Sequence, residues 1–167
     1  MNIVFDFDGV FTDGNFIYSN EGKVLKVFGP HDSDGLKILK SSNFDVQIIT
    51  ADERGYDISS RRLQDMGYDL SLVKESNRFD WIKKNHDLDH LVYMADGIWD
   101  INILKNCKFS ICPFNAPKLV KNYCDFVTLS KGGDGAVLEA SLEILKRFNQ
   151  KHYLRICMEI GLDEKYI

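Results

Sequence analysis

The sequence predicts an α/β protein: a Rossmann-like, three-layer α/β/α domain with a mostly parallel sheet and a small β-hairpin protrusion. β-type and helix-type segments alternate along most of the chain, which is the order of a parallel sheet with right-handed crossovers. The first strand is an apolar run at residues 3–5 that leads directly into Asp6-Phe7-Asp8-Gly9. Two further β-like runs flank Asn20-Glu21-Gly22 with no helix between them, and they predict the hairpin.

Each element follows from its own apolar pattern. Residues 2–7 are expected to form the first strand, and residues 15–19 and 23–28 the hairpin, which therefore spans about 15–28. The other expected strands cover residues 46–50, 70–73, 91–94, 108–112 and 125–129. The expected helices cover residues 32–42, 54–66, 76–86, 98–105, 116–123 and 132–147.

The length and composition are those of one globular domain. A chain of 167 residues with 44% hydrophobic and 28% charged residues can bury a core without staples. Residues 1–150 are expected to form the domain. Residues 151–167 are too apolar for a free tail, so we expect them to pack on that domain or on a neighbouring subunit. The net charge of −4 gives no electrostatic case for nucleic acid or a membrane as a partner.

The cysteines and the N-terminal residues indicate a cytoplasmic protein. The chain has four cysteines and none of them forms a CxxC pair, which favours free thiols in a reducing compartment over a metal site. The first ten residues lack the charged and apolar regions of a secretory signal. No apolar run is long enough to span a membrane.

Two carboxylates, Asp6 and Asp8, stand at the expected tip of the first strand. Side chains two residues apart point the same way from an extended backbone, and α/β sheets bind ligands at the carboxyl ends of their strands. Such close carboxylates repel each other unless a cation lies near them, and Mg²⁺ prefers oxygen ligands. One Asp could then attack phosphorus while the other transfers the proton. The alternative is a strand-end turn with two solvated carboxylates.

Polar residues also follow two later strands. Thr50 closes the strand at 46–50, where its hydroxyl and the next backbone amide, that of Ala51, could bind phosphate; the alternative is a capping threonine. Asp96 and Asp100 follow another expected strand, and alone they would fit an acidic helix-capping loop.

A basic residue between these elements completes the set. Arg78, with Lys74 four residues before it, could neutralise the charge of a phosphate. Most basic residues on a helix are instead solvated surface. The sequence leaves open which of the two would be the phosphate clamp.

In this order, the motifs resemble the haloacid dehalogenase superfamily of phosphohydrolases. The closer resemblance is to its small capless branch of 3-deoxy-octulosonate 8-phosphate phosphatases and related nonulosonate 9-phosphate phosphatases. It covers about residues 2–148 and implies a Mg²⁺-dependent phosphomonoesterase that acts on a small phosphorylated sugar or sugar acid. The segments that carry it are FDFDGVFTDG at 5–14, DSDGL at 32–36, IITAD at 48–52, the Asn77-Arg78 pair, MADGIWD at 94–100 and KGGDGAVLE at 131–139.

The resemblance assigns a role to each residue. Asp6 is the nucleophile that forms an aspartyl-phosphate, and Asp8 protonates the leaving alcohol and later activates water. Mg²⁺ is held by the Asp6 side chain, the Asp8 main-chain carbonyl and Asp96. Asp100 lies outside the direct metal ligands, and Thr50 and Ala51 bind the phosphate. Arg78 is the phosphate clamp, and Asp32 takes part in substrate binding.

Several positions depart from the pattern of that branch. The clamp is usually Lys and is Arg78 here, and the later loop is usually Gly-Asp-Asp and is Ala95-Asp96-Gly97 here. Asp52 stands where Arg commonly follows Thr-Gly, and Leu138 stands where Arg is common in the glycine-rich motif. These changes are compatible with phosphatase chemistry and bear mainly on the identity of the substrate.

The resemblance further implies a homotetramer in which hairpins pack centrally and neighbouring subunits cover each active site. One alternative is a catalytically weak homologue that serves as an oligomerisation module, like the phosphatase-like tail of sialic acid cytidylyltransferases. Another is a receiver-like phosphoacceptor domain, but the close DxDGxxT spacing and the GGxGA segment favour the hydrolase.

Overall fold

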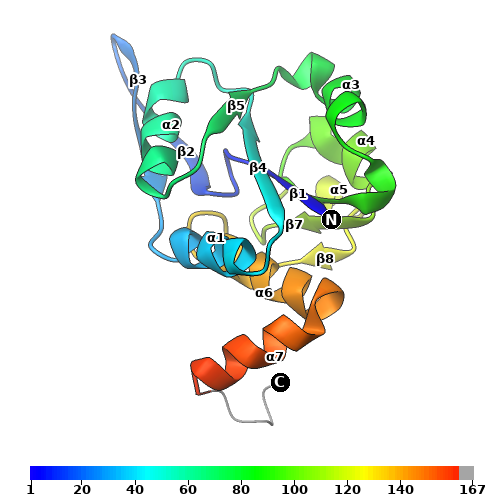
Figure 1. Cartoon of the computed structure of the whole chain (residues 1–167). Helices are drawn as coiled ribbons and strands as arrows, with labels where there is room; N and C mark the ends of the chain where they lie inside the picture. The colour runs from blue at the N-terminus through cyan, green and yellow to red at the C-terminus, as the bar shows by residue number, and fades with distance from the viewer. Residues whose placement is uncertain (162–167) are drawn as a thin grey trace.

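A six-stranded parallel sheet forms the centre of the molecule in a computed structural model that describes residues 1–161 (Figure 1). Its strands lie in the order β5-β4-β1-β6-β7-β8. In chain order they are β1 (Asn2–Asp6), β4 (Asp45–Thr50), β5 (Leu70–Leu72), β6 (Leu91–Met94), β7 (Phe109–Cys112) and β8 (Phe126–Val127). The predicted α/β/α fold with a mostly parallel sheet is confirmed.

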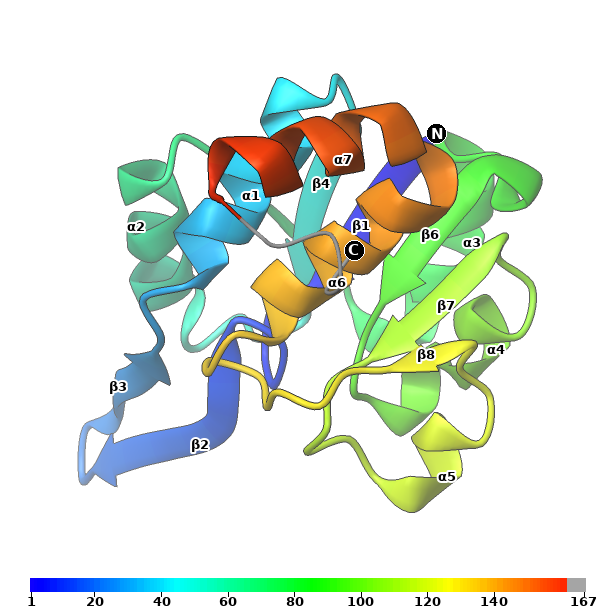
Figure 2. The ribbon, with the colours of Figure 1, turned by 90° about the horizontal axis from the view of Figure 1, so that it is seen from below.

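Helices cover both faces of this sheet (Figure 2). The helices are α1 (Asp32–Ser41), α2 (Tyr56–Asp65), α3 (Glu75–Asn85), α4 (Ile101–Leu104), α5 (Lys118–Lys121), α6 (Ala136–Phe148) and α7 (Gln150–Glu159). The expected helix at 98–105 divides into a short 3₁₀ turn, η2 (Ile98–Asp100), followed by α4, and another 3₁₀ turn, η1 (Leu88–His90), precedes β6. None of the helices within residues 1–161 combines the length and the apolar character needed to cross a membrane.

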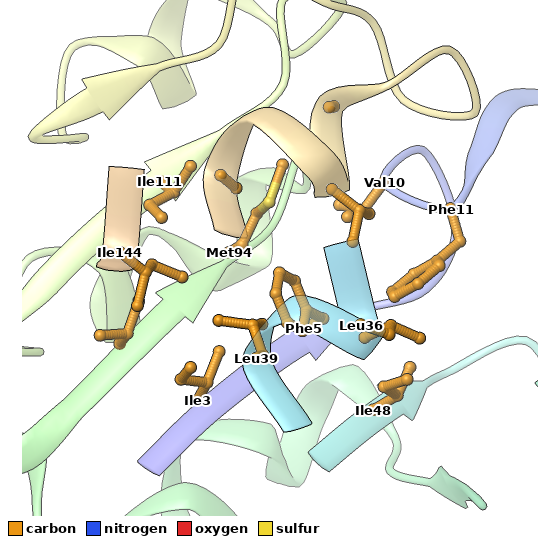
Figure 3. Packing of buried hydrophobic residues seen from close by; sticks show 14 of the residues in the cluster. Ile3, Phe5, Val10, Phe11, Leu36, Leu39, Ile48, Met94, Ile111 and Ile144 are labelled. Carbon is orange, nitrogen blue, oxygen red and sulfur yellow. The ribbon is translucent and has the colours of Figure 1, made fainter. Parts of the chain in front are cut away.

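The core is split by the sheet into two apolar clusters. Because β1 is a central strand, its alternate side chains are buried on both faces. Ile3 and Phe5 pack toward α1 and α6 (Figure 3). Val4 packs toward α3 and α4 on the opposite face. Each fully buried aliphatic or aromatic side chain contributes about 1.5–3 kcal/mol. The apolar run that predicted the first strand is therefore what holds Asp6 at a fixed place.

The hairpin extends away from the sheet as a separate two-stranded ribbon (Figures 1 and 2). It consists of β2 (Thr12–Ser19) and β3 (Gly22–Phe28), so it begins earlier than the predicted residue 15. Its base is attached to the core, since the ring of Phe28 packs edge-on against Phe7 with centroids 5.9 Å apart. Beyond this base most of its apolar side chains are exposed.

The C-terminal helix α7 lies against α6, below the sheet in Figure 1. Its side chains Ile156 and Cys157 are buried. Part of the apolar tail is thus buried against α6, whereas Met158 and Ile160 are exposed, so packing on a neighbouring subunit stays a prediction. Residues 162–167, which belong to the same predicted tail, lie outside the described part of the chain.

Candidate active site

The predicted site residues meet at the carboxyl end of β1. Asp6 is the last residue of β1, Thr50 is the last residue of the neighbouring β4, and Asp96 follows β6 on the other side. The connections from β1 lead outward through β4 to β5, whereas those from β6 lead outward to β8. Open α/β sheets bind ligands at such a switch point, so the strand order gathers residues that are distant in the sequence.

A tight loop after β1 places Asp8 next to the loop that follows β6. Phe7, between the two carboxylates, is buried and stacks on Phe11 with ring centroids 5.4 Å apart. Gly9 has a φ of 78°, and a Cβ atom there would lie 2.0 Å from Asp96 Oδ2. Both the backbone conformation and the close approach require glycine, which explains why Gly9 follows the acidic pair.

Asp6 is buried among other charged groups. Burial raises its pKa well above the usual value, the nearby Arg78 opposes this rise, and Asp100, Asp96 and Asp8 add to it. Arg78 Nη1 lies 3.4 Å from Asp6 Oδ2. Several carboxylates in so little space favour a bound cation, because Arg78 offsets their mutual repulsion only in part.

Asp8 is held by a hydrogen bond to each of its oxygens. Thr50 Oγ1 donates to Asp8 Oδ2 over 2.7 Å, and Lys26 Nζ donates to Asp8 Oδ1 over 2.6 Å. The Asp8 side chain is 20% exposed and lines a cavity. A fixed carboxylate that still faces a cavity has the placement that proton transfer to a bound substrate needs.

Thr50 is accordingly engaged with the second Asp of the motif. Its Oγ1 also accepts a hydrogen bond from the backbone N–H of Asp52 over 3.0 Å. Ala51, next to it, lines the cavity. A contact of Thr50 or Ala51 with phosphate stays a prediction.

Arg78 forms a second buried cation on the other side of Asp6. Its Nη1 donates to both carboxylate oxygens of Asp100, over 2.8 and 2.9 Å, and Tyr93 Oη donates to Asp100 Oδ1 over 2.5 Å. Burial lowers the pKa of Arg78, but Asp6, Tyr93 and Asp100 raise it by more. Asp100 thus holds the guanidinium in place, and Arg78 reaches the cavity as a permanent positive charge.

The oxygen donors around Asp6 fit a magnesium ion. Burial, together with the charges of Asp100 and Asp8, raises the pKa of Asp96 to about 6, so Asp96 and Asp6 are both carboxyls that a cation would stabilise as anions. Within residues 1–161 no group of three or more His, Cys, Asp or Glu side chains could hold a metal by itself. The predicted set needs only two side chains, with the Asp8 carbonyl as a third oxygen, and hard oxygen donors suit Mg²⁺.

A cavity of about 600 Å³ opens in front of these residues. Four of the predicted residues, Asp6, Asp8, Ala51 and Arg78, line it. The hairpin, the loop after β4 and the start of α3 supply the rest of the wall, namely Phe16, Lys23, Asp52, Glu53, Lys74, Glu75 and Ser76. Lys74 and Arg78 both reach the cavity, but Lys74 is exposed and only Arg78 contacts Asp6.

Asp32, predicted to bind substrate, is not brought to this cavity. It is 1% exposed, and its Oδ1 has no hydrogen-bond partner among the described residues. Burial raises its pKa to about 7 against the opposing charge of Arg62. Within this chain the residue is therefore a buried carboxyl, and its substrate contact stays a prediction.

Two lysines of the hairpin and one tyrosine were missed by the sequence interpretation. Lys26 contacts Asp8 and Asp52, Lys23 contacts Asp52, and Tyr93 holds Asp100. The signal for the lysines was their presence in an otherwise apolar β-like run, Lys23–Phe28. Tyr93 gave no signal, because an aromatic residue in a buried strand is ordinary core.

A parallel sheet whose strand ends carry this acidic pair, a threonine and a further acid beside a buried cation is the architecture of a haloacid dehalogenase-type phosphohydrolase. The chain is 34% identical to the 3-deoxy-D-manno-octulosonate 8-phosphate phosphatase of Haemophilus influenzae over 149 residues, 86% of this chain and 82% of that protein. The Yersinia pestis enzyme of the same name is 28% identical over 82% of this chain and 75% of its own length. The chain belongs to the family of 3-deoxy-D-manno-octulosonate 8-phosphate phosphatases.

Solved structures agree with this placement. A cobalt-bound octulosonate 8-phosphate phosphatase from Haemophilus influenzae superposes with a TM-score of 0.76 at 29% identity, covering 92% of this chain and 95% of that one. The Moraxella catarrhalis enzyme, in complex with magnesium, phosphate and KDO, gives 0.79 at 28% identity over 94% and 92% of the two chains. No family model matches the chain in a scan against such models.

Proposed function

We propose that this protein is a Mg²⁺-dependent phosphomonoesterase that hydrolyses a phosphorylated sugar acid of the 3-deoxy-octulosonate 8-phosphate or nonulosonate 9-phosphate type. The observation that carries the proposal is the placement of Asp6 and Asp8 at the cavity, with Arg78 beside the first and a donor on each oxygen of the second. The names of the relatives support the substrate class. The free cysteines fit the reducing cytoplasm.

The chemistry follows from the two carboxylates. A carboxylate oxygen of Asp6 attacks phosphorus, the bond from phosphorus to the ester oxygen breaks, and Asp8 gives its proton to the departing alkoxide. Asp8, now ionised, takes a proton from the water that attacks the aspartyl-phosphate, which releases inorganic phosphate and restores Asp6. Arg78 provides positive charge beside this reaction. Mg²⁺, held by Asp6, Asp96 and the Asp8 carbonyl, would stabilise charge on the transferred phosphoryl group.

The hairpin supports the assembly part of the proposal, a homotetramer in which neighbouring subunits complete the sites. Six of its apolar side chains are between 42% and 56% exposed, namely Phe16, Ile17, Tyr18, Val24, Leu25 and Val27. Other exposed apolar residues lie in the loops that follow β6, β7 and β8, including Trp99, Phe114 and Leu129. Exposed apolar patches of this kind mark interaction sites.

Phosphate release tests the proposed function. The wild-type protein should hydrolyse p-nitrophenyl phosphate and members of a panel of phosphorylated sugars and sugar acids when Mg²⁺ is present, and EDTA should stop it. Asp6→Asn should abolish turnover while circular dichroism shows an intact fold, because an amide is a poor nucleophile. A folded wild-type protein that releases no phosphate from any ester would contradict the proposal and favour the oligomerisation module.

A further inference from the structure

The hairpin exposes apolar side chains and buries a charged one, which is the reverse of the usual pattern. Along β3 the apolar residues Val24, Leu25 and Val27 are exposed, whereas the side chain of Lys26 is completely buried. Lysine is almost never fully buried unless its charge is paired, because an unpaired ammonium loses its hydration without compensation. A packing role for the ribbon would place its apolar face inward, so the buried lysine needs another explanation.

Three oxygens surround the Lys26 ammonium. Its Nζ donates to Asp8 Oδ1 over 2.6 Å and to Ser59 Oγ over 2.7 Å, and it forms an ion pair with Asp52 Oδ2 at 2.8 Å. The buried charge is therefore paired with two carboxylates. Asp52 also forms an ion pair with Lys23, which lies three residues before Lys26 on β3. These contacts hold the Lys26 ammonium in a fixed position next to Asp8.

The backbone around α2 makes room for this side chain. A Cβ atom on Gly55 would lie 2.6 Å from Lys26 Cε and 2.3 Å from Asp52 Oδ2. Ser59, on the first turns of α2, orients its Oγ toward Lys26 while donating to the Gly55 carbonyl over 3.1 Å. The absence of a side chain at Gly55 therefore leaves the space that the Lys26 side chain occupies, and Ser59 gives its ammonium a hydrogen-bond acceptor.

We propose that Lys26 is a positioning residue for the acid–base carboxylate Asp8. This role rests on the proposed phosphatase function. With Thr50 on Oδ2 and Lys26 on Oδ1, both oxygens of Asp8 are held, and the plane of its carboxylate toward the cavity is fixed. Without Lys26, the Thr50 hydroxyl alone restrains Asp8, and the carboxylate is free to turn away from the leaving group. Proton transfer requires hydrogen-bond distance and alignment, so it suffers more than the attack by Asp6 does.

The test compares two substrates that differ in their need for a proton. Benzyl phosphate releases an alkoxide that must be protonated, whereas p-nitrophenyl phosphate releases a stable anion. The values of kcat/KM for both report the steps up to phosphoryl transfer. Lys26→Met should lower kcat/KM for benzyl phosphate at least about 10-fold more than for p-nitrophenyl phosphate. This selective loss should stay below the loss of about 10²–10⁴ that is typical when a general acid itself is removed.

Matched variants distinguish a positioning role of Lys26 from a purely structural one. Lys37→Met removes an exposed lysine on α1 and should leave both values unchanged. Lys26→Gln keeps an N–H donor and should restore part of the selective loss; it also replaces Lys26→Met as the test if that variant fails to fold by circular dichroism. Asp8→Asn marks the full size of the selective loss.

The possible outcomes are distinct. A loss of kcat/KM in Lys26→Met that is larger for benzyl phosphate than for p-nitrophenyl phosphate, with neither value changed in Lys37→Met, supports the proposal. Equal losses on both substrates, or no loss on either, would overturn it while leaving the phosphatase function in place. A wild-type protein inactive on every ester would overturn the proposed function and this role together.

Discussion

Two buried cations flank the acidic pair, and they are supplied by different parts of the molecule. Arg78 belongs to α3 and contacts Asp6 and Asp100, so it is fixed by the packing of the sheet and its helices. Lys26 belongs to β3 of the hairpin and contacts Asp8 and Asp52. The proposed nucleophile, Asp6, therefore depends on the domain itself, whereas the proposed acid–base residue, Asp8, depends on a ribbon with no core of its own. Substitutions on the Arg78 side should therefore reduce the stability of the domain, whereas substitutions on the hairpin side should reduce its assembly.

The largest effect is expected on the Arg78 side. Arg78→Met leaves Asp6 and Asp100 buried without their counter-charge, and breaking a buried pair costs about 3–5 kcal/mol. Denaturant unfolding should show this loss of stability, and phosphatase activity should be lost with it. Arg78→Lys keeps the charge but loses the planar guanidinium, so its free energy of unfolding should lie between those of the wild type and Arg78→Met. Wild-type stability of Arg78→Met would show that the domain does not depend on this cluster.

The loop after β6, which carries Asp96 and Gly97, gives the second contrast. Asp96→Ala should sharply raise the Mg²⁺ concentration needed for half-maximal activity, because it removes the carboxylate proposed as a direct oxygen ligand. Gly97→Asp should raise it less. The inserted Cβ would lie 2.7 Å from Asp100 Oδ2, however, so this variant should also lose some stability through the Arg78 pair. Equal, small changes in metal requirement in the two variants would mean that Asp96 is not a ligand.

The hairpin side should fail through assembly rather than through unfolding. Ile17→Asp and Val24→Asp place charges on exposed apolar positions of the ribbon. Light scattering at micromolar concentration should show a smaller assembly, and activity should fall partially, since in the proposed homotetramer a neighbour completes each site. The thermal melting of the domain should change little. A wild-type protein that is a fully active monomer would remove assembly from the mechanism.

The smallest effect on activity is expected at Asp32, a buried acid away from both clusters. Its pKa is about 7 in the folded protein and 3.8 in an ordinary site, so between these values the folded state binds more protons than the unfolded state. The free energy of unfolding should therefore fall as the pH rises from about 4 to about 7. Asp32→Asn should flatten this part of the curve and leave kcat near wild type. A wild-type slope in Asp32→Asn would assign the titration to another group.

Most of the fold could be predicted from the sequence because its determinants are local. Apolar runs and glycines placed the strands to within about two residues in most cases, and the strand at Leu91–Met94 was predicted without error. The short elements were less accurate: the expected strand at 125–129 is only Phe126–Val127, although the backbone N–H groups of Asp125 and Thr128 still donate to Ser110 and Cys112. A two-residue strand has too little periodicity to be delimited from its sequence.

By itself, the sequence predicted that Asp6 and Asp8 stand at the end of a buried strand, that Thr50 closes a later strand and Asp96 follows another, and that an apolar hairpin interrupts the alternation. These statements depend on residues close together in the chain. Only the tertiary structure decided which charges meet. It buried Lys26 instead of its apolar neighbours, joined Tyr93 to Asp100, and kept Asp32 out of the cavity. The physical reason is that an ion pair depends on the approach of segments distant in sequence, and no local pattern encodes that distance.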